Sequence, residues 1–532
     1  MTALPLDHVG TVAAASVIVA SAVLIRFIIY PIFLSPLSKV PAAHPLACVT
    51  PLWIQWRRWR GTEFECIAGA FARKGPYVRL APNEIAVNAI EAVQNVYGVG
   101  SNNFDKHPSY DYFVTQGARN VFTSLAKDHR ARRRSISSIY SRSFVQTSPH
   151  ARAIMHSLMV DRMLPVLTRA SASHDSCRGL NVLPLFQSFA LDFMSSFAFG
   201  VSRSFDFIRD EHARWRWINQ FNLSYPPESA FWMKEYPLLV KLLPAVGIAM
   251  VPSGHSNARK ACEDWALDKV EECEAVVQRA GGDLRSAMSL PPGELPVLYS
   301  HVRSGLARRR AGSEKGFVPD QNDKRELAST MFTYMIYELS RHEKIQDQLR
   351  QEFLAIEAPF LYDGSLQPCI ALPSPQSLER LPFLDCVIKE SLRLRNNAPN
   401  LDPRVTPAKP HCKVGLLTNL PPGVRVGTYG WCLNRNAEVF PRPESWEPHR
   451  WQCGGPEAAA RRGQWLFAFG GGSRGCIGQQ VAMELMRLLL CGIYTNFRTT
   501  VADESEYPGA NEFVGSDCKK KLFIRFEKLG NL

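Results

Sequence analysis

The chain begins with a long apolar stretch that precedes the amphipathic part of the sequence. Residues 9–25 carry no charge, and the apolar run continues past Arg26 to Leu34. This run is long enough to span a bilayer as one helix, with Arg26 reaching toward the interface. Basic residues follow the run and predict that the rest of the chain lies on the cytosolic side: Lys39, Arg57, Arg58 and Arg60.

Two other interpretations of this run are weaker. A cleaved signal peptide needs basic residues before the apolar stretch, where the chain has only Asp7. A buried core helix is the second alternative. Pro36, Pro41 and Pro45 follow and predict a stiff linker, which favours an anchor over a core helix.

Beyond the linker, the apolar spacing changes from strand-like to helical. Residues 77–80 and 84–87 alternate around Ala81-Pro82-Asn83 and predict a hairpin. From about Glu91 the spacing is mainly helical, and short strands return between residues 414 and 429. We expect helices at residues 132–144, 182–199, 257–279, 325–356 and 384–394, and an exposed loop at residues 308–324. The expected fold class is mainly α with a small β portion.

Composition narrows the class of protein. With 532 residues, 46% of them hydrophobic, the chain can bury a large core in one domain or two. The 13 cysteines include no CxxC pair, which favours a reducing compartment over a disulfide framework. The net charge of +13 is accompanied by no motif that reads DNA or RNA, so we expect no nucleic-acid partner. An anionic membrane surface or an acidic protein explains the basic excess.

The strongest chemical signal lies in residues 469–478. Five of these ten residues are glycine, and Cys476 precedes an apolar, helix-favouring run at residues 481–490. A helix N-terminus favours the thiolate form of a nearby cysteine. A thiolate in a glycine-rich turn, with Phe469 and Arg474 close in sequence, suits an axial ligand of haem iron. A structural cysteine in a glycine loop is the alternative interpretation.

These ten residues resemble the signature of the cytochrome P450 family, Phe-x-x-Gly-x-Arg-x-Cys-x-Gly, and match every fixed position. The resemblance covers about residues 36–532 and implies the cytochrome P450 fold as a haem-thiolate domain there. A membrane anchor at residues 1–35, a single transmembrane helix, would precede it. The implied cofactor is haem b (iron protoporphyrin IX) with the Cys476 thiolate as its metal ligand.

Two further motifs resemble the same family. Glu390 and Arg393 match its Glu-x-x-Arg, and residues 448–451 (Pro-His-Arg-Trp) resemble its Pro-Glu-Arg-Phe. The resemblance implies that Glu390, Arg393 and Arg450 form a buried ion network that supports the cysteine loop. Removing one partner of such a network strands a buried charge.

The resemblance also implies which residues bind the cofactor. His129 and Arg133 occupy the place of the family's Trp-x-x-x-Arg and would face one side of a helix toward a haem propionate. Arg404 and Arg474 are the other expected propionate partners, and Phe469 completes the cofactor-binding set. An arginine run on a solvated face is the alternative for residues 130–134. The family places a substrate-lining loop at Tyr110, Tyr112 and Phe113. The alternative is that these aromatic residues are part of the hydrophobic core.

The chain departs from the family in its central helix. The family's glycine-containing motif, with an acid and an alcohol that guide protons, is missing from residues 325–342. Residues 326–340 give only about 22 Å of helix. A look-alike, Ala280-Gly281-Gly282-Asp283, is expected to be a loop, so we assign no catalytic residue. Ser329, Thr330 or Thr333 would be the substitute alcohol.

Three explanations of the missing motif stay open: a segment lost from the gene model between Ser329 and Thr330, an altered proton delivery, or a loss of oxygen activation. The resemblance implies a monooxygenase that oxidises a lipophilic small molecule, using O2 and electrons from NADPH–cytochrome P450 reductase. The anchor, the linker at residues 37–41 and the basic motif at residues 128–134 resemble those of fungal microsomal enzymes of secondary metabolism. We therefore expect the chain to be anchored in the endoplasmic reticulum and to touch membrane lipid through residues 215–243. A haem-thiolate isomerase or dehydratase, or a catalytically impaired relative, is the alternative.

Overall fold

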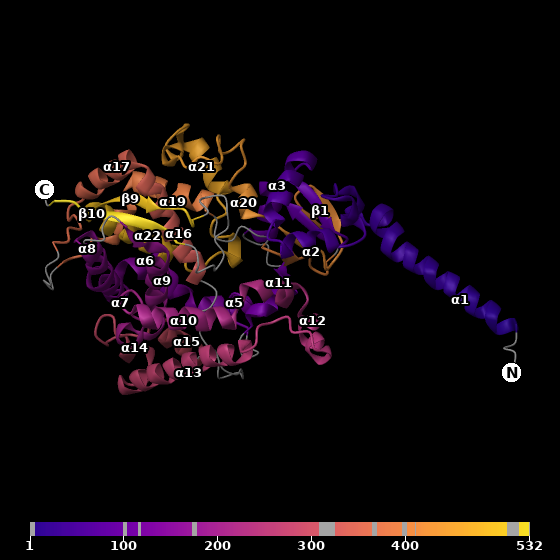
Figure 1. Cartoon of the computed structure of the whole chain (residues 1–532), viewed down its shortest axis with the longest axis horizontal. Helices are drawn as coiled ribbons and strands as arrows, with labels where there is room; N and C mark the ends of the chain where they lie inside the picture. The colour runs from indigo at the N-terminus through magenta and orange to yellow at the C-terminus, as the bar shows by residue number, and fades with distance from the viewer. Residues whose placement is uncertain are drawn as a thin grey trace. The chain divides into compact units, whose positions relative to one another are not determined.

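The computed structural model describes residues 6–98, 104–114, 119–172, 178–307, 325–363, 370–395, 402–409, 411–507 and 521–530. The described chain is mainly helical with small sheets, which confirms the expected fold class (Figure 1). It separates into two compact units. Unit 1 comprises Met1–His107, Ala398–Leu433 and Gly470–Ser473, and unit 2 comprises Pro108–Asn397, Asn434–Phe469 and Arg474–Leu532.

Unit 1 begins with the expected apolar helix. It consists of α1 (Leu6–Leu24) and a π-helical continuation, η1 (Ile25–Leu34), which contains Pro31. The stretch Thr11–Leu34 is long and apolar enough to cross a membrane, and no part of its most apolar window is buried. Near the end of η1, the buried Arg79 donates a hydrogen bond to the Pro31 carbonyl at 2.7 Å. The other helix of sufficient length and apolarity, α9 (Val182–Phe199), is 94% buried and is a core helix.

The proline-rich segment after η1 packs onto unit 1. It forms two short 3-10 helices, η2 (Pro36–Lys39) and η3 (Pro45–Cys48), each with proline at its first position. Leu37, Val40 and Ala47 are buried, and the Arg79 amide donates to the Pro41 carbonyl at 2.8 Å. The expectation of a stiff linker was therefore wrong in one respect, because backbone hydrogen bonds join the segment to Arg79 of the sheet and its apolar side chains are buried.

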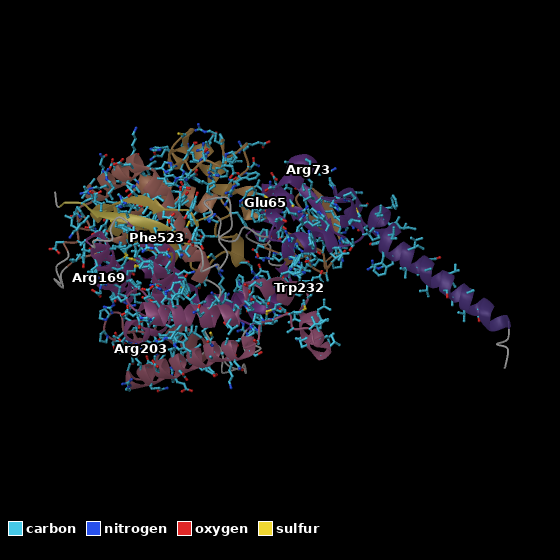
Figure 2. All side chains as sticks on the ribbon, viewed as in Figure 1. Glu65, Arg73, Arg169, Arg203, Trp232 and Phe523 are labelled. Atoms are coloured by element: carbon cyan, nitrogen blue, oxygen red, sulfur yellow. The ribbon has the colours of Figure 1, made fainter. Side chains whose placement is uncertain are left out.

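A five-stranded sheet organises unit 1. Its order is β1 (Tyr77–Ala81), β2 (Glu84–Val87), β8 (Arg425–Gly427), β5 (Arg404–Val405) and β3 (Asp105–Lys106). The predicted hairpin is confirmed, since Tyr77 pairs with Val87 in an antiparallel register. The remaining elements of unit 1 are α2 (Leu52–Trp59), α3 (Glu63–Lys74), α4 (Ile90–Tyr97), α20 (Gly430–Leu433) and the pair β6 (Cys412–Val414) and β7 (Leu417–Leu420). Figure 2 labels Glu65 and Arg73 on α3.

Unit 2 is a helical body with one small sheet. The sheet has the order β4 (Leu180–Asn181), β10 (Phe523–Lys528) and β9 (Phe497–Asp503), and Figure 2 labels Phe523 at the start of β10. The α-helices before the gap at residue 308 are α5 (Ala126–Ile136), α6 (Arg142–Thr147), α7 (Pro149–His156), α8 (Leu164–Ala172), α9, α10 (Glu211–Ser224), α11 (Pro227–Glu235), α12 (Pro237–Leu242), α13 (His255–Arg279), α14 (Leu284–Ala287) and α15 (Val297–Ala307). Those after it are α16 (Arg325–Arg341), α17 (Glu343–Leu354), α18 (Pro375–Glu379), α19 (Pro382–Leu394), α21 (Gly455–Trp465) and α22 (Gln479–Asn496).

The core of unit 2 gathers around α9, α16 and α22. Nearly every residue of α9 is buried, and α16 packs against it through Phe332, whose ring lies 5.4 Å from that of Phe189. Met335, Ile336 and Leu339 of α16 are buried as well. Helix α16, in which the expected glycine-containing motif is missing, is therefore a core helix over its described side chains.

Two expected helices are interrupted. The helix expected at residues 132–144 ends at Ile136, continues as the 3-10 helix η5 (Ser137–Tyr140) and restarts at Arg142, because Ser141 adopts an extended ψ of 150° and caps α6. The helix expected at residues 325–356 breaks at His342, which has φ −127° and ψ 75° and separates α16 from α17. Neither break involves glycine or proline, so apolar spacing alone did not reveal them.

The other expected elements agree with the structure where it describes them. Helices at Val182–Phe199, His255–Arg279 and Pro382–Leu394 match the predicted ranges within two residues. The loop expected at residues 280–283 is confirmed, and Asp283 caps α14 by accepting from the Ser286 amide at 2.9 Å. The loop expected at residues 308–324 lies outside the described residues.

Candidate functional site

The loop around Cys476 has the form that its glycines predict. The Cys476 amide donates to the Phe469 carbonyl at 2.8 Å, which closes the turn. Cys476 carries an exposed free thiol, and α22 begins three positions later at Gln479. The predicted place of the cysteine, just ahead of a helix N-terminus, is confirmed.

Gly472 is required by its surroundings as well as by its conformation. Its φ of +59° is left-handed, and a Cβ at this position would lie 2.0 Å from the Tyr97 carbonyl oxygen and 2.5 Å from that of Gly98. Real Cβ atoms do not approach backbone oxygens this closely, so only glycine fits. These contacts lie within unit 1.

Arg133 binds the other side of the cysteine turn. Its Nη1 donates to the Gly475 carbonyl at 2.8 Å, one residue before Cys476. Burial lowers the pKa of Arg133, and the nearby Cys476 thiol opposes that shift. Within the described part of the chain, no carboxylate pairs with Arg133. A partly buried guanidinium beside the thiol, without an acidic partner, fits an anionic cofactor group such as a haem propionate.

Two further buried side chains come from α5 and from η5, which follows it directly. His129 lies four positions before Arg133 on α5 and is buried. Tyr140 of η5 is buried too, and its pKa is raised, first by burial and then by the proximity of Cys476. Sequence reasoning missed Tyr140, although an aromatic residue seven positions after Arg133 was a usable signal.

The remaining expected cofactor residues divide between the two units. Arg474 donates through Nη1 to the Ser124 carbonyl at 2.5 Å, and Phe469 packs against the unit 2 core. Arg404 belongs to unit 1, where it binds both carboxylate oxygens of Asp402 at 2.7 and 3.0 Å and lies over the Tyr97 ring. The structure therefore brings Arg133, Arg474 and Phe469 to the Cys476 turn and describes Arg404 only within its own unit.

The expected ion network is present and fully buried. Glu390 accepts from Arg393 Nε and Nη2 at 2.9 and 2.8 Å and from Arg450 Nε at 2.8 Å. It also accepts from Trp451 Nε1 at 2.9 Å and from the Glu447 amide at 2.9 Å. A carboxylate with five donors is well compensated in a dry environment. The contribution of Trp451 was not expected from the sequence.

A short chain of hydrogen bonds joins this network to the cysteine turn. Arg393 Nη1 donates to the Asn434 carbonyl at 3.0 Å, and the Asn434 side chain accepts from the Phe467 amide at 2.9 Å. Phe467 lies two residues before Phe469, whose carbonyl holds the Cys476 amide. The ion network therefore fixes the backbone that carries the turn.

The candidate alcohols lie on α16. This helix has 17 residues, consistent with the short central helix expected from the sequence. Thr333 is buried, Thr330 is half-buried, and the side chain of Ser329 lies outside the described residues. One turn beyond Tyr334, burial raises the pKa of the Glu338 carboxyl.

The aromatic residues expected near substrate form a cluster in unit 2. Tyr110, Phe113 and Phe122 contact one another with ring centroids 5.1 to 6.4 Å apart. Lys234 of α11 places its ammonium 5.0 Å from the rings of Tyr112 and Phe113. The cluster connects η4 (Pro108–Phe113) to α11.

Comparison with known proteins agrees with these features. A family model described as Cytochrome P450 matches residues 327–522. The cytochrome P450 monooxygenase avaI of Aspergillus versicolor is 26% identical over 78% of this chain and 94% of its own length. The cytochrome P450 monooxygenase sdnE of Sordaria araneosa is 27% identical over 89% of both chains. The cytochrome P450 monooxygenase aneF of Aspergillus aculeatus is 24% identical over 90% of this chain and 91% of its own length.

Proposed function

Because the chain belongs to the cytochrome P450 family and is a P450 monooxygenase, we propose that it oxidises a lipophilic small molecule at a haem held by Cys476. One observation carries this proposal: the Cys476 turn is closed by the Phe469 carbonyl and flanked by the partly buried cation Arg133, which has no acidic partner among the described residues. When bound, haem b supplies the activation of O2.

The protein's own residues would hold and orient the cofactor. Cys476 would provide a thiolate ligand to the iron, Phe469 would pack beside the cofactor, and Arg133 would neutralise a propionate. His129 and Arg474 of unit 2 would complete the proposed propionate set. Arg404, the other expected partner, lies in unit 1 and is paired there with Asp402. The proposed haem-thiolate domain extends over residues 36–532.

Helices α10 to α12 would cover the substrate channel. Trp232 of α11 (Figure 2) lies within 6 Å of the Phe231 and Tyr236 rings, and Leu238, Leu242 and Val246 beyond it are exposed. An aromatic segment that ends in exposed leucines suits contact with membrane lipid and entry of an apolar substrate. The relatives named above are cytochrome P450 monooxygenases of fungi, and we propose a role in fungal secondary metabolism.

Electrons would come from NADPH–cytochrome P450 reductase. The net charge of +13 supports docking of an acidic partner, and basic side chains such as Arg130 and Arg134 of α5 are exposed. The helix Thr11–Leu34 would anchor the chain in the endoplasmic reticulum with the catalytic domain in the cytosol.

A second candidate function follows from α16. Its 17 residues lack the glycine-containing centre that delivers protons to bound oxygen in the family, so a haem-thiolate isomerase or dehydratase is the alternative. Such an enzyme turns over without NADPH or reductase. Turnover that requires both supports the monooxygenase and excludes the alternative.

The test of the proposal begins with Cys476→Ser in the full-length protein. We expect the wild type to show the long-wavelength Soret band of a thiolate-ligated carbon monoxide complex and the variant to lose it. A variant that keeps this band would refute Cys476 as the ligand. A cDNA read across codons 325–340 resolves the missing centre, because a longer transcript would restore the motif between Ser329 and Thr330.

A further inference from the structure

Helix α16 and the residue that follows it carry four side chains that can each take up and release a proton. They are Thr330, Tyr334, Glu338 and His342, spaced four positions apart. Side chains with this spacing lie one above the other on one face of an α-helix. From the first to the last, the set extends along about 18 Å of helix. We call these four residues the α16 ladder.

Only the two ends of the ladder are accessible. The side chain of His342 is 41% exposed, and Thr330 is half-buried. Between them, Glu338 is 5% exposed and Tyr334 is fully buried. A buried middle with accessible ends is what a path for protons through a core requires, because protons enter at one end and are consumed at the other.

The outer step of the ladder joins His342 to Glu338. His342 Nδ1 lies 3.9 Å from Oε2 of Glu338 and 2.7 Å from the Glu338 carbonyl oxygen. The ring of Trp446 lies 5.0 Å from the imidazole and limits its movement. An imidazole that takes up a proton at Nε2 and gives one from Nδ1 is a proton shuttle.

Tyr334 is the member that packing alone does not explain. Its hydroxyl is buried and makes no hydrogen bond with any residue that the structure describes. An unpaired buried hydroxyl costs about 1–3 kcal/mol, which phenylalanine would avoid. The Tyr507 hydroxyl, which is buried and unpaired in the same sense, lies near enough to Glu338 for the carboxyl to affect its pKa. Bound water bridges polar groups of this kind in protein interiors.

The surroundings of Glu338 favour neither of its protonation states strongly. Burial raises the pKa of its carboxyl, while Tyr334, His342, Arg341 and Arg395 oppose that rise. Arg395, at the end of α19, lies 5.4 Å from the Tyr334 ring. Opposing influences on one carboxyl keep both protonation states within reach, which a proton carrier needs.

We propose that the α16 ladder conducts protons from the surface at His342 through Glu338 and Tyr334 to Thr330, in place of the acid–alcohol pair that is missing from residues 325–342. The inference rests on the proposed monooxygenase function, which consumes the protons: RH + O2 + 2 H+ + 2 electrons give ROH + H2O, with NADPH as the electron donor.

Each step of this path leaves the ladder as it began. The His342 imidazole gives its Nδ1 proton to the Glu338 carboxylate and takes another from water at Nε2. Burial raises the pKa of Tyr334, so its hydroxyl gives a proton to Thr330 only while it receives one from Glu338. At every step one N–H or O–H bond breaks as the next O–H bond forms.

The first test is infrared spectroscopy of the full-length protein on transfer from H2O to D2O, which needs neither substrate nor turnover. The C=O band of protonated Glu338 is the one that the wild type shows and Glu338→Gln lacks. We expect this band to shift at once in D2O, and at least about tenfold more slowly in His342→Gln. Loss of no band in Glu338→Gln overturns the proposal, as does an equal rate of shift in His342→Gln.

The second test follows the reduction of O2 by the full-length protein with NADPH and its reductase, without added substrate. Forming water takes four protons for each O2, whereas forming hydrogen peroxide takes two, so water formation depends more on proton delivery. We expect Glu338→Gln and Tyr334→Phe to slow water formation about a hundredfold. The carbon monoxide band of thiolate ligation should stay, which shows that each variant folds and holds haem.

Tyr337→Phe is the matched control, because it removes a buried phenol hydroxyl from the same helix outside the ladder, where Tyr337 accepts from Arg341 at 3.0 Å. It should form water at the wild-type rate. A wild-type rate in Tyr334→Phe overturns the proposal, and so does an equal loss in Tyr337→Phe, which would indicate altered packing. If the wild type shows no thiolate band and consumes no O2, the proposed function fails, and the infrared exchange alone decides whether the ladder conducts protons.

Discussion

Arg133 of α5 holds the carbonyl of Gly475 at 2.8 Å and thereby joins a distant helix to the residue before the cysteine. One guanidinium serves two purposes here. It fixes the turn through a neutral oxygen and leaves a positive charge beside Cys476.

Replacing Arg133 should weaken cofactor retention. Arg133→Gln removes the cation, and a hydrogen bond to a charged group contributes about 1.5–3 kcal/mol, so we expect haem to leave at least about tenfold faster. Haem transfer to apomyoglobin measures this rate. Arg134→Gln is the control, because Arg134 is exposed on the same helix. Equal rates in both variants would contradict the assigned role.

Removing the Glu390 carboxylate should destabilise unit 2. Glu390→Ala removes the acid shared by the buried Arg393 and Arg450 and leaves Arg450 only its longer pair with Glu447 at 3.5 Å, which costs about 3–5 kcal/mol in the free energy of unfolding. Denaturant unfolding in detergent measures the loss. Asp385→Asn on the same helix removes a partly exposed pair with Lys389 and should cost less than about 1 kcal/mol. A loss at Glu390 as small as that at Asp385 would show that the network is dispensable.

Gly472→Ala should prevent correct closure of the cysteine turn. The new Cβ would meet the Tyr97 carbonyl at 2.0 Å in a left-handed backbone, and such strain alone costs about 1–3 kcal/mol. We expect little haem-loaded protein, measured as haem per polypeptide. Gly463→Ala in α21 is the matched control, since its Cβ meets nothing within 4 Å and helical alanine is favoured by up to about 1 kcal/mol. Normal haem loading of the Gly472 variant would refute the close approach.

The stability of the fold should fall as pH rises through neutrality because of Glu484. Burial raises the pKa of this α22 carboxyl from 4.5 to about 7, while Arg487 and Arg152 oppose the shift. The folded state therefore binds a proton that the unfolded chain has lost, so the contribution is complete below pH 4.5 and is lost above pH 7. Between pH 5 and pH 8 it amounts to about 3 kcal/mol.

The measurement is the free energy of unfolding at several pH values. Glu484→Gln should flatten the curve relative to the wild type, and Glu457→Gln, an exposed change in α21, should leave the slope as it was. If the free energy of unfolding depends on pH in the same way in the wild type and in Glu484→Gln, the carboxyl is not protonated in the folded state.

The sequence predicted best those features in which one residue type has one physical use. The glycines of the cysteine turn, the hairpin at Tyr77–Val87 and the Glu390–Arg393–Arg450 network were all expected and are all present. At the glycines and the hairpin, the residue type imposes a local geometry. The network spans sixty positions between Glu390 and Arg450, and its residues were expected because they match two family motifs.

What the sequence did not reveal depends on which of several possible partners a polar side chain takes. The breaks at Ser141 and His342 occur where side chains bind nearby backbone: Ser141 accepts from the Phe144 amide, and His342 Nδ1 lies 2.7 Å from the Glu338 carbonyl oxygen. The pairing of Arg404 with Asp402 competes with its expected role and was missed, although the two residues are only two positions apart. The bond from Trp451 to Glu390 follows from tertiary packing.

The hydrogen bond from Arg79 to the Pro31 carbonyl has a mechanical consequence. Arg79 is immobilised in strand β1 by its own bonds to the carbonyls of Ala81 and Pro82. The C-terminal end of the apolar helix is therefore tied to the sheet by this bond. If the helix is the proposed membrane anchor, rotating it about its long axis would also turn strand β1, because the two are joined by this bond.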